Sequence, residues 1–182
     1  MIRVLLFTLL SFAVIMPAQA DVVDRSPAGF TVKTTVTVSA VPARVFAALV
    51  NDIGQWWDSA HTFSGDAGNM WLTPSPGGCL CETLGRGGGV EHAVVNHVVV
   101  GELIRLRGAL GPLQEYGVVG SLTWSFAAAG EGTTATVTYS VGGVFPGGLD
   151  KLADAVDTVI GGQLRRLKAY AERPIPQLPI PR

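Results

Sequence analysis

The sequence predicts an α+β domain in which an antiparallel sheet packs against a long C-terminal helix. Three features support this: an alternating strand followed by a helix that begins at a proline, a series of strands joined by glycine-rich turns, and one long amphipathic helix near the end of the chain. Short connections between successive strands are typical of an antiparallel meander. The predicted order is a strand, two short helices, six more strands and the long helix.

The first strand and the two short helices occupy the stretch that begins at residue 31. Valines alternate with polar residues over 31–38, which is the period of a half-buried strand. Pro42 suits the first turn of a helix, where its missing N–H is not needed, and 42–50 carries one apolar stripe. A second helical turn ends at the pair Trp56–Trp57.

The middle of the chain consists of predicted strands and turns. Glycine and proline clusters separate apolar or alternating runs. The segment 108–120 contains several glycines and Pro112, so it is predicted to be a loop or a broken edge. The strands are predicted at residues 67–72, 79–84, 90–100, 102–107, 121–128 and 134–141.

The long helix is predicted over residues 149–171. Aspartates lie early in it and arginine and lysine late, an order that complements the helix dipole. Gly161 and Gly162 fall in its middle, where each costs about 1 kcal/mol relative to alanine. We expect this pair to mark a kink or a close contact with the sheet, with helix mobility as the alternative.

The first twenty residues have the pattern of an export signal. Arg3 precedes an apolar run over 4–15, which is shorter than the roughly 20 residues that span a bilayer, and the run ends in an A-x-A cleavage pattern at Ala20. We therefore expect a periplasmic or secreted protein with no stable membrane anchor after cleavage, and an uncleaved anchor is the alternative. The predicted segments are a signal peptide at 1–20, a flexible leader at 21–29, one domain at 30–172 and a disordered proline-rich tail at 173–182.

Charge and composition exclude some classes of partner. The chain has 13 basic and 14 acidic residues, and removal of Arg3 with the signal leaves 12 against 14, a formal charge of −2. This balance, without any basic run, argues against a nucleic-acid partner. Because 48% of residues are hydrophobic and 15% are charged, the chain can fill a core and line a cavity.

Cys79 and Cys81 are the two cysteines of the chain. Residues two apart in a strand lie about 6.6–6.8 Å apart at Cα, the outer limit of disulfide geometry. The spacing therefore predicts two unpaired, buried thiols. The two thiols with His92 make a weak candidate for a soft-metal site, but a strand histidine beside small buried cysteines is the favoured interpretation. No metal and no cofactor is predicted.

Several stretches of the chain resemble one superfamily. They are 41–49, 55–57, the turn 76–78 leading to Glu82, and the terminal run from 147–149 to 164–167. Together they resemble the SRPBCC or START-like superfamily over residues 30–172, most closely the branch of the Aha-type heat-shock ATPase activator C-terminal domain, with a polyketide cyclase-like character as well. The predicted export departs from the co-chaperone interpretation, because an exported protein is separated from a cytosolic chaperone.

The resemblance implies a helix-grip fold, in which a curved antiparallel sheet surrounds the C-terminal helix and a hydrophobic cavity lies between them. Members bind lipids, sterols, polyketides or hormones, and some are cyclases or hydrolases. The leading hypothesis is therefore a binding protein for a small hydrophobic molecule or lipid. The mobile segment 108–120 and the C-terminal helix would control entry to the cavity.

Aromatic residues are the candidate apolar contacts for a ligand. Consecutive tryptophans cannot face the same way, so one of Trp56 and Trp57 is expected in the core and the other at the rim of the cavity. Plain packing is the alternative for every tryptophan. The candidate aromatic residues are Trp56, Trp57, Trp71, Trp124 and Tyr139.

Glu82, His92 and Arg105 are the candidate polar contacts. Glu82 lies in an apolar strand, where it faces either the interior, as an anchor or general acid or base, or the solvent. The hairpin should bring His92 close to Cys81 or Glu82. A second hypothesis is therefore a cyclase or hydrolase with Glu82 and His92 as its acid/base pair. A third is an interaction module of the cell envelope, which would have a filled interior and a large exposed apolar patch.

Overall fold

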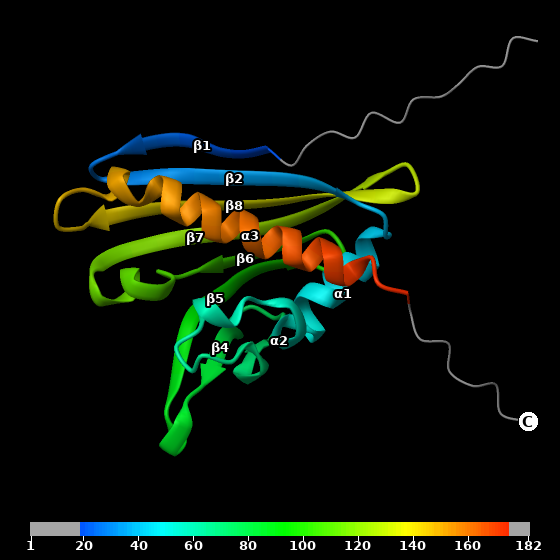
Figure 1. The fold of residues 1–182 in the computed structure, drawn as a ribbon, viewed down its shortest axis with the longest axis horizontal. Coiled ribbons are helices and arrows are strands. Elements are labelled where there is room, and N and C mark those ends of the chain that lie inside the picture. Colours follow the sequence, from blue (N-terminus) through cyan, green and yellow to red (C-terminus); the bar gives the residue numbers. More distant parts are fainter. Residues whose placement is uncertain (1–18, 175–182) are drawn as a thin grey trace, which may run out of the picture.

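The computed structural model describes residues 19–174, and the rest of the predicted signal peptide and tail lies outside this range. An antiparallel sheet in the order β1-β2-β8-β7-β6-β5-β4-β3 runs alongside the long helix α3 (Figure 1). The strands are β1 (Gln19–Ser26), β2 (Gly29–Val38), β3 (Met70–Leu72), β4 (Cys79–Thr83), β5 (Gly89–Val99), β6 (Leu103–Arg107), β7 (Gly117–Ala129) and β8 (Gly132–Val144). The α-helices are α1 (Pro42–Asn51), α2 (Ile53–Trp56) and α3 (Ala153–Ala171), and the 3₁₀ turns are η1 (Ser59–His61), η2 (Ala67–Asn69), η3 (Gly85–Gly87), η4 (Gly111–Glu115) and η5 (Leu149–Leu152).

This architecture confirms the predicted α+β class and the helix-grip fold. Alternate residues of β2 and β8 are buried, and the helices cover the same face of the sheet (Figure 1). Val45, Phe46 and Leu49 form the buried stripe of α1. The core therefore lies between the inner face of the sheet and the helices, and alternating polar residues remain on the outer face.

The strand β1 corrects the prediction of a flexible leader at residues 21–29. Asp21 pairs with Lys33 and Asp24 with Thr31, so most of the leader is the edge strand of the sheet. An ion pair of 2.7 Å from Arg25 to Asp154 connects this edge to α3. The leader was not recognised as a strand because its charged residues hide the alternation. Cleavage after Ala20, if it occurs, leaves 21–26 of this strand in place.

Two other predicted segments differ from the structure in their details. The predicted strand 67–72 consists of the turn η2 followed by the short strand β3. The side chain of Asp66 accepts a hydrogen bond of 2.8 Å from the Gly68 N–H, which stabilises a turn at this point. The predicted loop 108–120 contains the turn η4 and the start of β7.

The glycine pair of α3 marks a close contact with the sheet. A Cβ on Gly161 would lie 3.0 Å from the Thr34 hydroxyl oxygen on β2, whereas a Cβ on Gly162 would meet nothing within 4 Å. Gly161 therefore allows α3 to approach β2, as the first of the two sequence interpretations proposed. Gly162 has no such contact.

Strand β5 contains two β-bulges. Leu80 pairs with Ala93 and Cys81 with Glu91, so His92 is an extra residue between two pairs. In the second bulge Val95 pairs with Leu106 and His97 with Arg105 of β6, so Asn96 is the extra residue. A bulge turns two consecutive side chains to one face of the sheet. As a result His92 joins Ala93 on the inner face, where both are buried, and Asn96 joins His97 on the exposed outer face.

The first of these bulges lies beside a disulfide that the sequence interpretation excluded. Cys79 and Cys81 are joined by a disulfide bond, and their Cα atoms are 5.4 Å apart. The prediction of two unpaired thiols is wrong because it assumed a regular strand. The register shift occurs between Leu80 and Cys81, and the chain is contracted there.

No helix within residues 19–174 is long and apolar enough to cross a bilayer.

Candidate ligand-binding cavity

A cavity of about 590 Å³ lies between α3, the segment 57–63, the turn η4 and the inner face of the sheet. Its volume is within the range of small-molecule sites in proteins. The apolar lining from α3 and the turn before it consists of Leu152, Ala155, Val156, Val159 and Ile160. The aromatic lining consists of Trp57, Phe63, Tyr116, Tyr139 and Phe145.

The aromatic side chains are arranged from the floor of the cavity to its rim. Tyr139 is 1% exposed on β8 and lies in the floor, whereas Phe63 is 51% exposed and Tyr116 is 39% exposed. Tyr116 packs edge-on against Phe145, with ring centroids 4.6 Å apart. The rim therefore presents apolar surface to the solvent, and the interior offers apolar contact to a ligand.

His92 is the buried polar side chain of the cavity wall. It is 6% exposed, and its Nε2 lies 3.0 Å from Oε2 of Glu82. The Phe63 ring packs beside it, with centroids 5.8 Å apart. The bulge of β5 places the imidazole on this face, because a regular strand would alternate it with Ala93.

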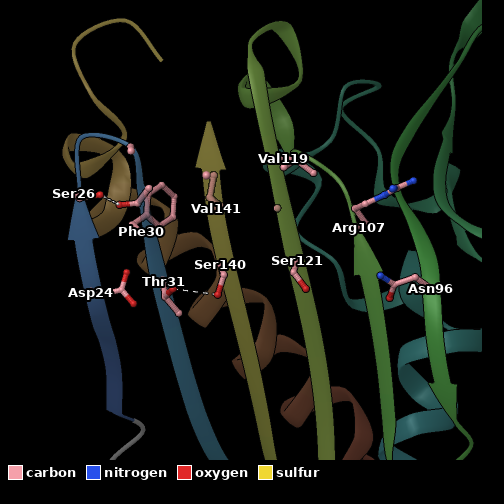
Figure 2. A pocket seen from close by; sticks show the side chains of 14 residues that line it. Asp24, Ser26, Phe30, Thr31, Asn96, Arg107, Val119, Ser121, Ser140 and Val141 are labelled. Atoms are coloured by element: carbon pink, nitrogen blue, oxygen red, sulfur yellow. Dashed lines mark hydrogen bonds between the residues drawn. The ribbon is translucent and has the colours of Figure 1, made fainter. Parts of the chain in front are cut away.

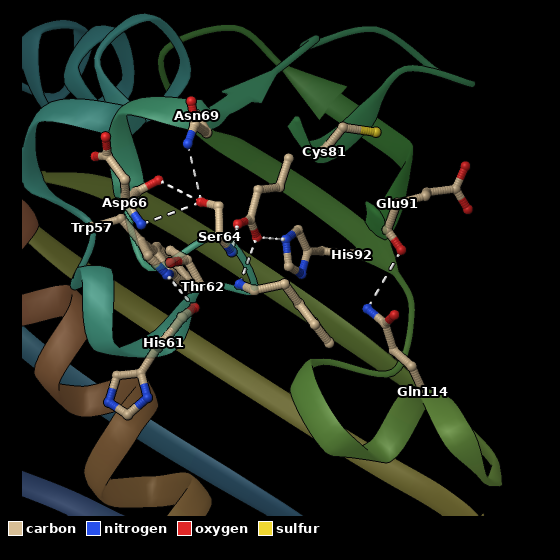
Figure 3. A network of polar contacts seen from close by, with 12 residues as sticks. Trp57, His61, Thr62, Ser64, Asp66, Asn69, Cys81, Glu91, His92 and Gln114 are labelled. Atoms are coloured by element: carbon tan, nitrogen blue, oxygen red, sulfur yellow. Dashed lines mark hydrogen bonds and ion pairs between the residues drawn. The ribbon is translucent and has the colours of Figure 1, made fainter. Parts of the chain in front are cut away.

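Glu82 lies behind His92 and joins the wall to the segment that follows α2. Its carboxylate accepts hydrogen bonds from the Phe63 N–H at 3.0 Å and the Ser64 N–H at 2.5 Å, in addition to the His92 contact. Figure 3 shows Ser64 and His92 within this network. The side chain of Glu82 is fully buried, so the alternative of a solvated, outward glutamate is wrong.

The charge state of Glu82 follows from these contacts. Burial opposes ionisation, but the hydrogen bonds from Ser64, the Phe63 backbone and His92 outweigh it and lower the pKa of Glu82. An ionised carboxylate only accepts hydrogen bonds, so Nε2 of His92 is the donor. Nδ1, for which no partner is found within residues 19–174, is then the ring nitrogen available to a ligand.

Three further hydrogen bonds hold segments around the cavity. The Tyr139 hydroxyl accepts a hydrogen bond of 3.0 Å from the Leu110 N–H and donates one of 3.2 Å to the Gly108 carbonyl, which holds the segment before η4. Burial raises the pKa of Tyr139 to about 12, so the hydroxyl stays protonated. On the opposite wall, the buried Gln163 of α3 accepts a hydrogen bond of 3.0 Å from the Asp58 N–H.

The structure brings only part of the predicted site together. Trp57, His92 and Tyr139 line the cavity, and Glu82 supports His92 from behind. Trp56 is buried against Trp124, with ring centroids 6.1 Å apart, and both belong to the core. Trp57 lines the cavity and Trp56 does not, but Trp57 is 8% exposed, so it lies in the buried wall and not at the rim where one of the pair was expected.

Two predicted ligand contacts lie away from the cavity. Trp71 is 44% exposed on the short strand β3, opposite Cys81. Arg105 projects from the outer face of β6, where its Nε donates to the Thr123 hydroxyl at 3.1 Å. The buried neighbours Ile104 and Leu106 already require Arg105 to face outward.

The remaining lining residues were missed because most lie in turns without periodicity. The turn residues include His61 and Thr62, and the segment around η4 contributes Leu110, Pro112 and Tyr116. The sequence signal that could have found them is the apolar content of a glycine-rich loop. A turn that lies fully in solvent seldom contains as many large apolar side chains as Leu110, Leu113 and Tyr116 supply here.

The alternative of a soft-metal site is not supported by the geometry. Cys79 and Cys81 are joined to each other, and a disulfide sulfur is not a thiolate ligand. Within residues 19–174, no group of three histidine, cysteine or carboxylate side chains is placed to hold a metal ion. His92 instead has a carboxylate partner.

Comparison with known proteins agrees with this geometry. Residues 29–172 match the family model described as polyketide cyclase / dehydrase and lipid transport. The chain belongs to this family. Membership in the polyketide cyclase and lipid transport family confirms the SRPBCC superfamily and supports binding of a hydrophobic ligand or a cyclase-type role. The resemblance to the Aha-type branch remains a prediction.

Solved structures show the same fold at low identity. An uncharacterised protein from Rhizobium leguminosarum is 23% identical, with a TM-score of 0.60 over 87% of this chain and 100% of that one. CalU16 from Micromonospora echinospora is 10% identical, with a TM-score of 0.59 over 86% and 87%. Ara h 8.0201 is 15% identical, with a TM-score of 0.54 over 79% and 97%. No functionally curated protein is a significant match to this member of the family.

Proposed function

We propose that the protein binds a small apolar molecule or lipid in the cavity and orients it through His92. The observation that carries this proposal is an apolar cavity of about 590 Å³ with the imidazole of His92 in its wall. Apolar contacts supply most of the affinity in such sites, and a few fixed polar groups orient the ligand. The family supports the same class of ligand.

The polar side chains of the cavity wall indicate which functional group the ligand carries. A ligand hydroxyl or phenol is the matching group, because a hydroxyl can either donate a hydrogen bond to Nδ1 of His92 or accept one from it. Glu82 fixes the ring, because its carboxylate accepts hydrogen bonds from two backbone N–H groups and from Nε2 of His92. A fatty alcohol, a sterol or a phenolic polyketide fits these requirements, because each carries a hydroxyl group on an apolar body.

The entrance involves the segment around η4. Leu110, Pro112 and Tyr116 line the cavity from this turn, and Tyr139 holds its start through Leu110. Movement of this segment would admit the ligand without disturbing the sheet. We further propose that the protein is exported and works in the periplasm or outside the cell, which the signal-like residues 1–20 support.

Filling the cavity tests the proposal. Val159 lines the cavity from α3, whereas its neighbour Thr158 is exposed and does not. Native mass spectrometry of protein from its own cells, and thermal shifts with a panel of sterols, fatty alcohols and phenolic polyketides, should show a ligand for the wild type and for Thr158→Trp. Val159→Trp should lose it. The absence of any ligand and of any thermal shift in the wild type would contradict the proposal.

A second candidate is an enzyme of the cyclase or hydrolase type, and the Glu82–His92 hydrogen bond of 3.0 Å favours it. A carboxylate that orients an imidazole is a common arrangement of a general base. In this case Glu82 positions the ring, and Nδ1 of His92 takes the proton. If the protein is an enzyme, His92→Asn should retain a molecule of different mass from that of the wild type, because substrate would accumulate.

A further inference from the structure

A second hollow, of about 540 Å³, lies on the outer face of the sheet, opposite the cavity. Figure 2 views this face, with strands β1, β2, β8, β7 and β6 side by side. Strand registry explains the hollow: Gly29 of β2 pairs with Gly142 of β8, and neither has a side chain to fill the surface. Gly29 cannot be replaced freely, because a Cβ there would lie 2.5 Å from the Val141 carbonyl oxygen.

A row of polar side chains crosses the hollow in register. Asp24 pairs with Thr31, Thr31 with Ser140, Ser140 with Ser121, and Ser121 with Arg107. Figure 2 shows Asp24, Thr31, Ser140 and Ser121 nearly in one line across the strands, with Arg107 off this line at one end. With neighbouring strands about 4.8 Å apart, four spacings separate Asp24 from Arg107 by about 19 Å. The row therefore has an acidic end, a hydroxyl centre and a basic end.

The basic end is shaped by the second bulge of β5. The bulge turns Asn96 to the outer face, on the strand that pairs with β6, and both Asn96 and Arg107 line the hollow. Both side chains are exposed, and neither has a hydrogen bond or ion pair within residues 19–174. The guanidinium of Arg107 offers N–H donors in a fork that matches a carboxylate, and the carboxamide of Asn96 adds a further donor from the adjacent strand.

The centre of the row suits hydroxyl groups. The Thr31 hydroxyl donates to the Ser140 hydroxyl at 3.1 Å, so Ser140 retains a proton to donate outward. Ser121 adds a further donor and acceptor. Asp24, at the far end, accepts hydrogen bonds from neutral hydroxyls and repels a second anionic group.

From this row we propose that the outer face binds an oligosaccharide that carries one terminal carboxylate. The carboxylate contacts Arg107 and Asn96, and sugar hydroxyls extend along Ser121, Ser140 and Thr31 toward Asp24. A polyanion fits poorly, because its further negative charges would be repelled by the Asp24 carboxylate at the other end of the row. A peptide fits less well, because the hollow lies on the face of the sheet, whereas peptides add as strands along an unpaired edge.

The proposal can be tested with three acidic oligosaccharides and their neutral parents: 3′-sialyllactose with lactose, glucuronyl-xylotriose with xylotriose, and maltotrionate with maltotriose. We expect at least one acidic member to bind in isothermal titration calorimetry, and to bind at least tenfold more tightly than its parent. Arg107→Ala should weaken that binding by about tenfold or more, since it removes a charge-assisted contact. Failure of all three acidic sugars to bind would overturn the proposal.

Arg105→Ala is the matched control. It removes the same charge from the same face of β6, but Arg105 does not line the hollow and its Nε is engaged by Thr123. Arg105→Ala should leave sugar affinity within about twofold of the wild type. Equal losses in the two variants would contradict a defined site and indicate general electrostatic attraction. Binding of an acidic peptide more tightly than of any acidic sugar would also overturn the proposal.

This site is independent of the cavity, which lies on the inner face. Val159→Trp should lose binding of the apolar ligand and retain binding of the acidic sugar. Arg107→Ala should lose affinity for the acidic sugar and retain binding of the apolar ligand. The two proposals can therefore fail separately.

Discussion

Glu82 and His92 are joined by a hydrogen bond, and the direction of that bond decides which nitrogen of His92 is free for a ligand. The buried carboxylate accepts from two backbone N–H groups and from Nε2, which leaves Nδ1 toward the ligand. The same carboxylate holds residues Phe63 and Ser64 at the edge of the cavity. A change at Glu82 should therefore alter both the stability of the fold and the orientation of His92.

The lowered pKa of Glu82 gives a stability prediction with a defined sign. The folded protein binds fewer protons than the unfolded chain just below the ordinary glutamate value of 4.5. The stabilisation from ionised Glu82 is thus complete above that pH and is lost as pH falls through the folded pKa. Glu82→Gln should cost about 1–3 kcal/mol at neutral pH and should lose less stability than the wild type on acidification.

Thermal unfolding between pH 7 and pH 3 measures this effect. Glu91→Gln is the matched control, because Glu91 is exposed on the neighbouring strand and its carboxylate makes none of these hydrogen bonds. The control should follow the wild-type curve. A Glu82→Gln curve parallel to that of the wild type would show that the network does not set the ionisation of Glu82.

At the residue level, sequence reasoning could find the polar members of the site but not its rim. A glutamate and a histidine in apolar strands are conspicuous candidates, but the sequence leaves open whether Glu82 faces inward, and only the structure shows that both are buried. The bulge that aims His92 inward leaves no sequence pattern. Residues such as Phe63 and Leu110 lie in turns, where no periodicity separates ligand contact from exposure.

At the scale of elements, α3 offers a direct test of helix packing. Gly162 has open space where a Cβ would be, so Gly162→Ala should raise the free energy of unfolding by up to about 1 kcal/mol through helix propensity. Gly161→Ala should raise the free energy of unfolding by less than Gly162→Ala does, or should lower it, because the new Cβ would lie 3.0 Å from the buried Thr34 hydroxyl oxygen. Urea denaturation of the two variants measures the difference. An equal gain at both positions would contradict the close contact with β2.

The disulfide between Cys79 and Cys81 makes a second prediction at this scale. It closes a loop of about three residues, for which chain entropy gives only about 1–2 kcal/mol of stabilisation. The double variant Cys79→Ser, Cys81→Ser should therefore fold, with a loss of that size in urea denaturation. The intact mass of the wild type should rise by two hydrogens on reduction. No mass change in protein purified without reductant would contradict the bond.

Elements differ in how well the sequence predicts them. The long helix and α1 have clear periodicity, and their predicted bounds are close to those observed. The predicted strands 121–128 and 134–141 cover only the central parts of β7 and β8. Strand β1 was missed because its polar residues face solvent at the edge of the sheet, where only its pairing with β2 reveals it. Residue types do not predict the Cys79–Cys81 disulfide, because the local contraction of the strand that brings the two Cα atoms to 5.4 Å leaves no sequence pattern.

At the scale of the whole molecule, the order of elements predicts the fold, but the cavity depends on three-dimensional shape. Its walls come from the segment after α2, the turn η4, strand β8 and α3, which are far apart in the sequence. The order of strands alone does not say whether side chains fill the space between sheet and helix. The open interior argues against an interaction module with a filled core.

The central claim is that the cavity holds an apolar ligand, and fluorine NMR tests it most directly. Protein labelled with 5-fluorotryptophan has four signals, which single Trp→Phe variants assign. Trp57 lines the cavity, and Trp71 is exposed on β3 away from it. Addition of a sterol, fatty alcohol or phenolic polyketide that raises the melting temperature should shift the Trp57 signal most and leave that of Trp71 unchanged. A shift confined to Trp71, or none at Trp57, would contradict the claim.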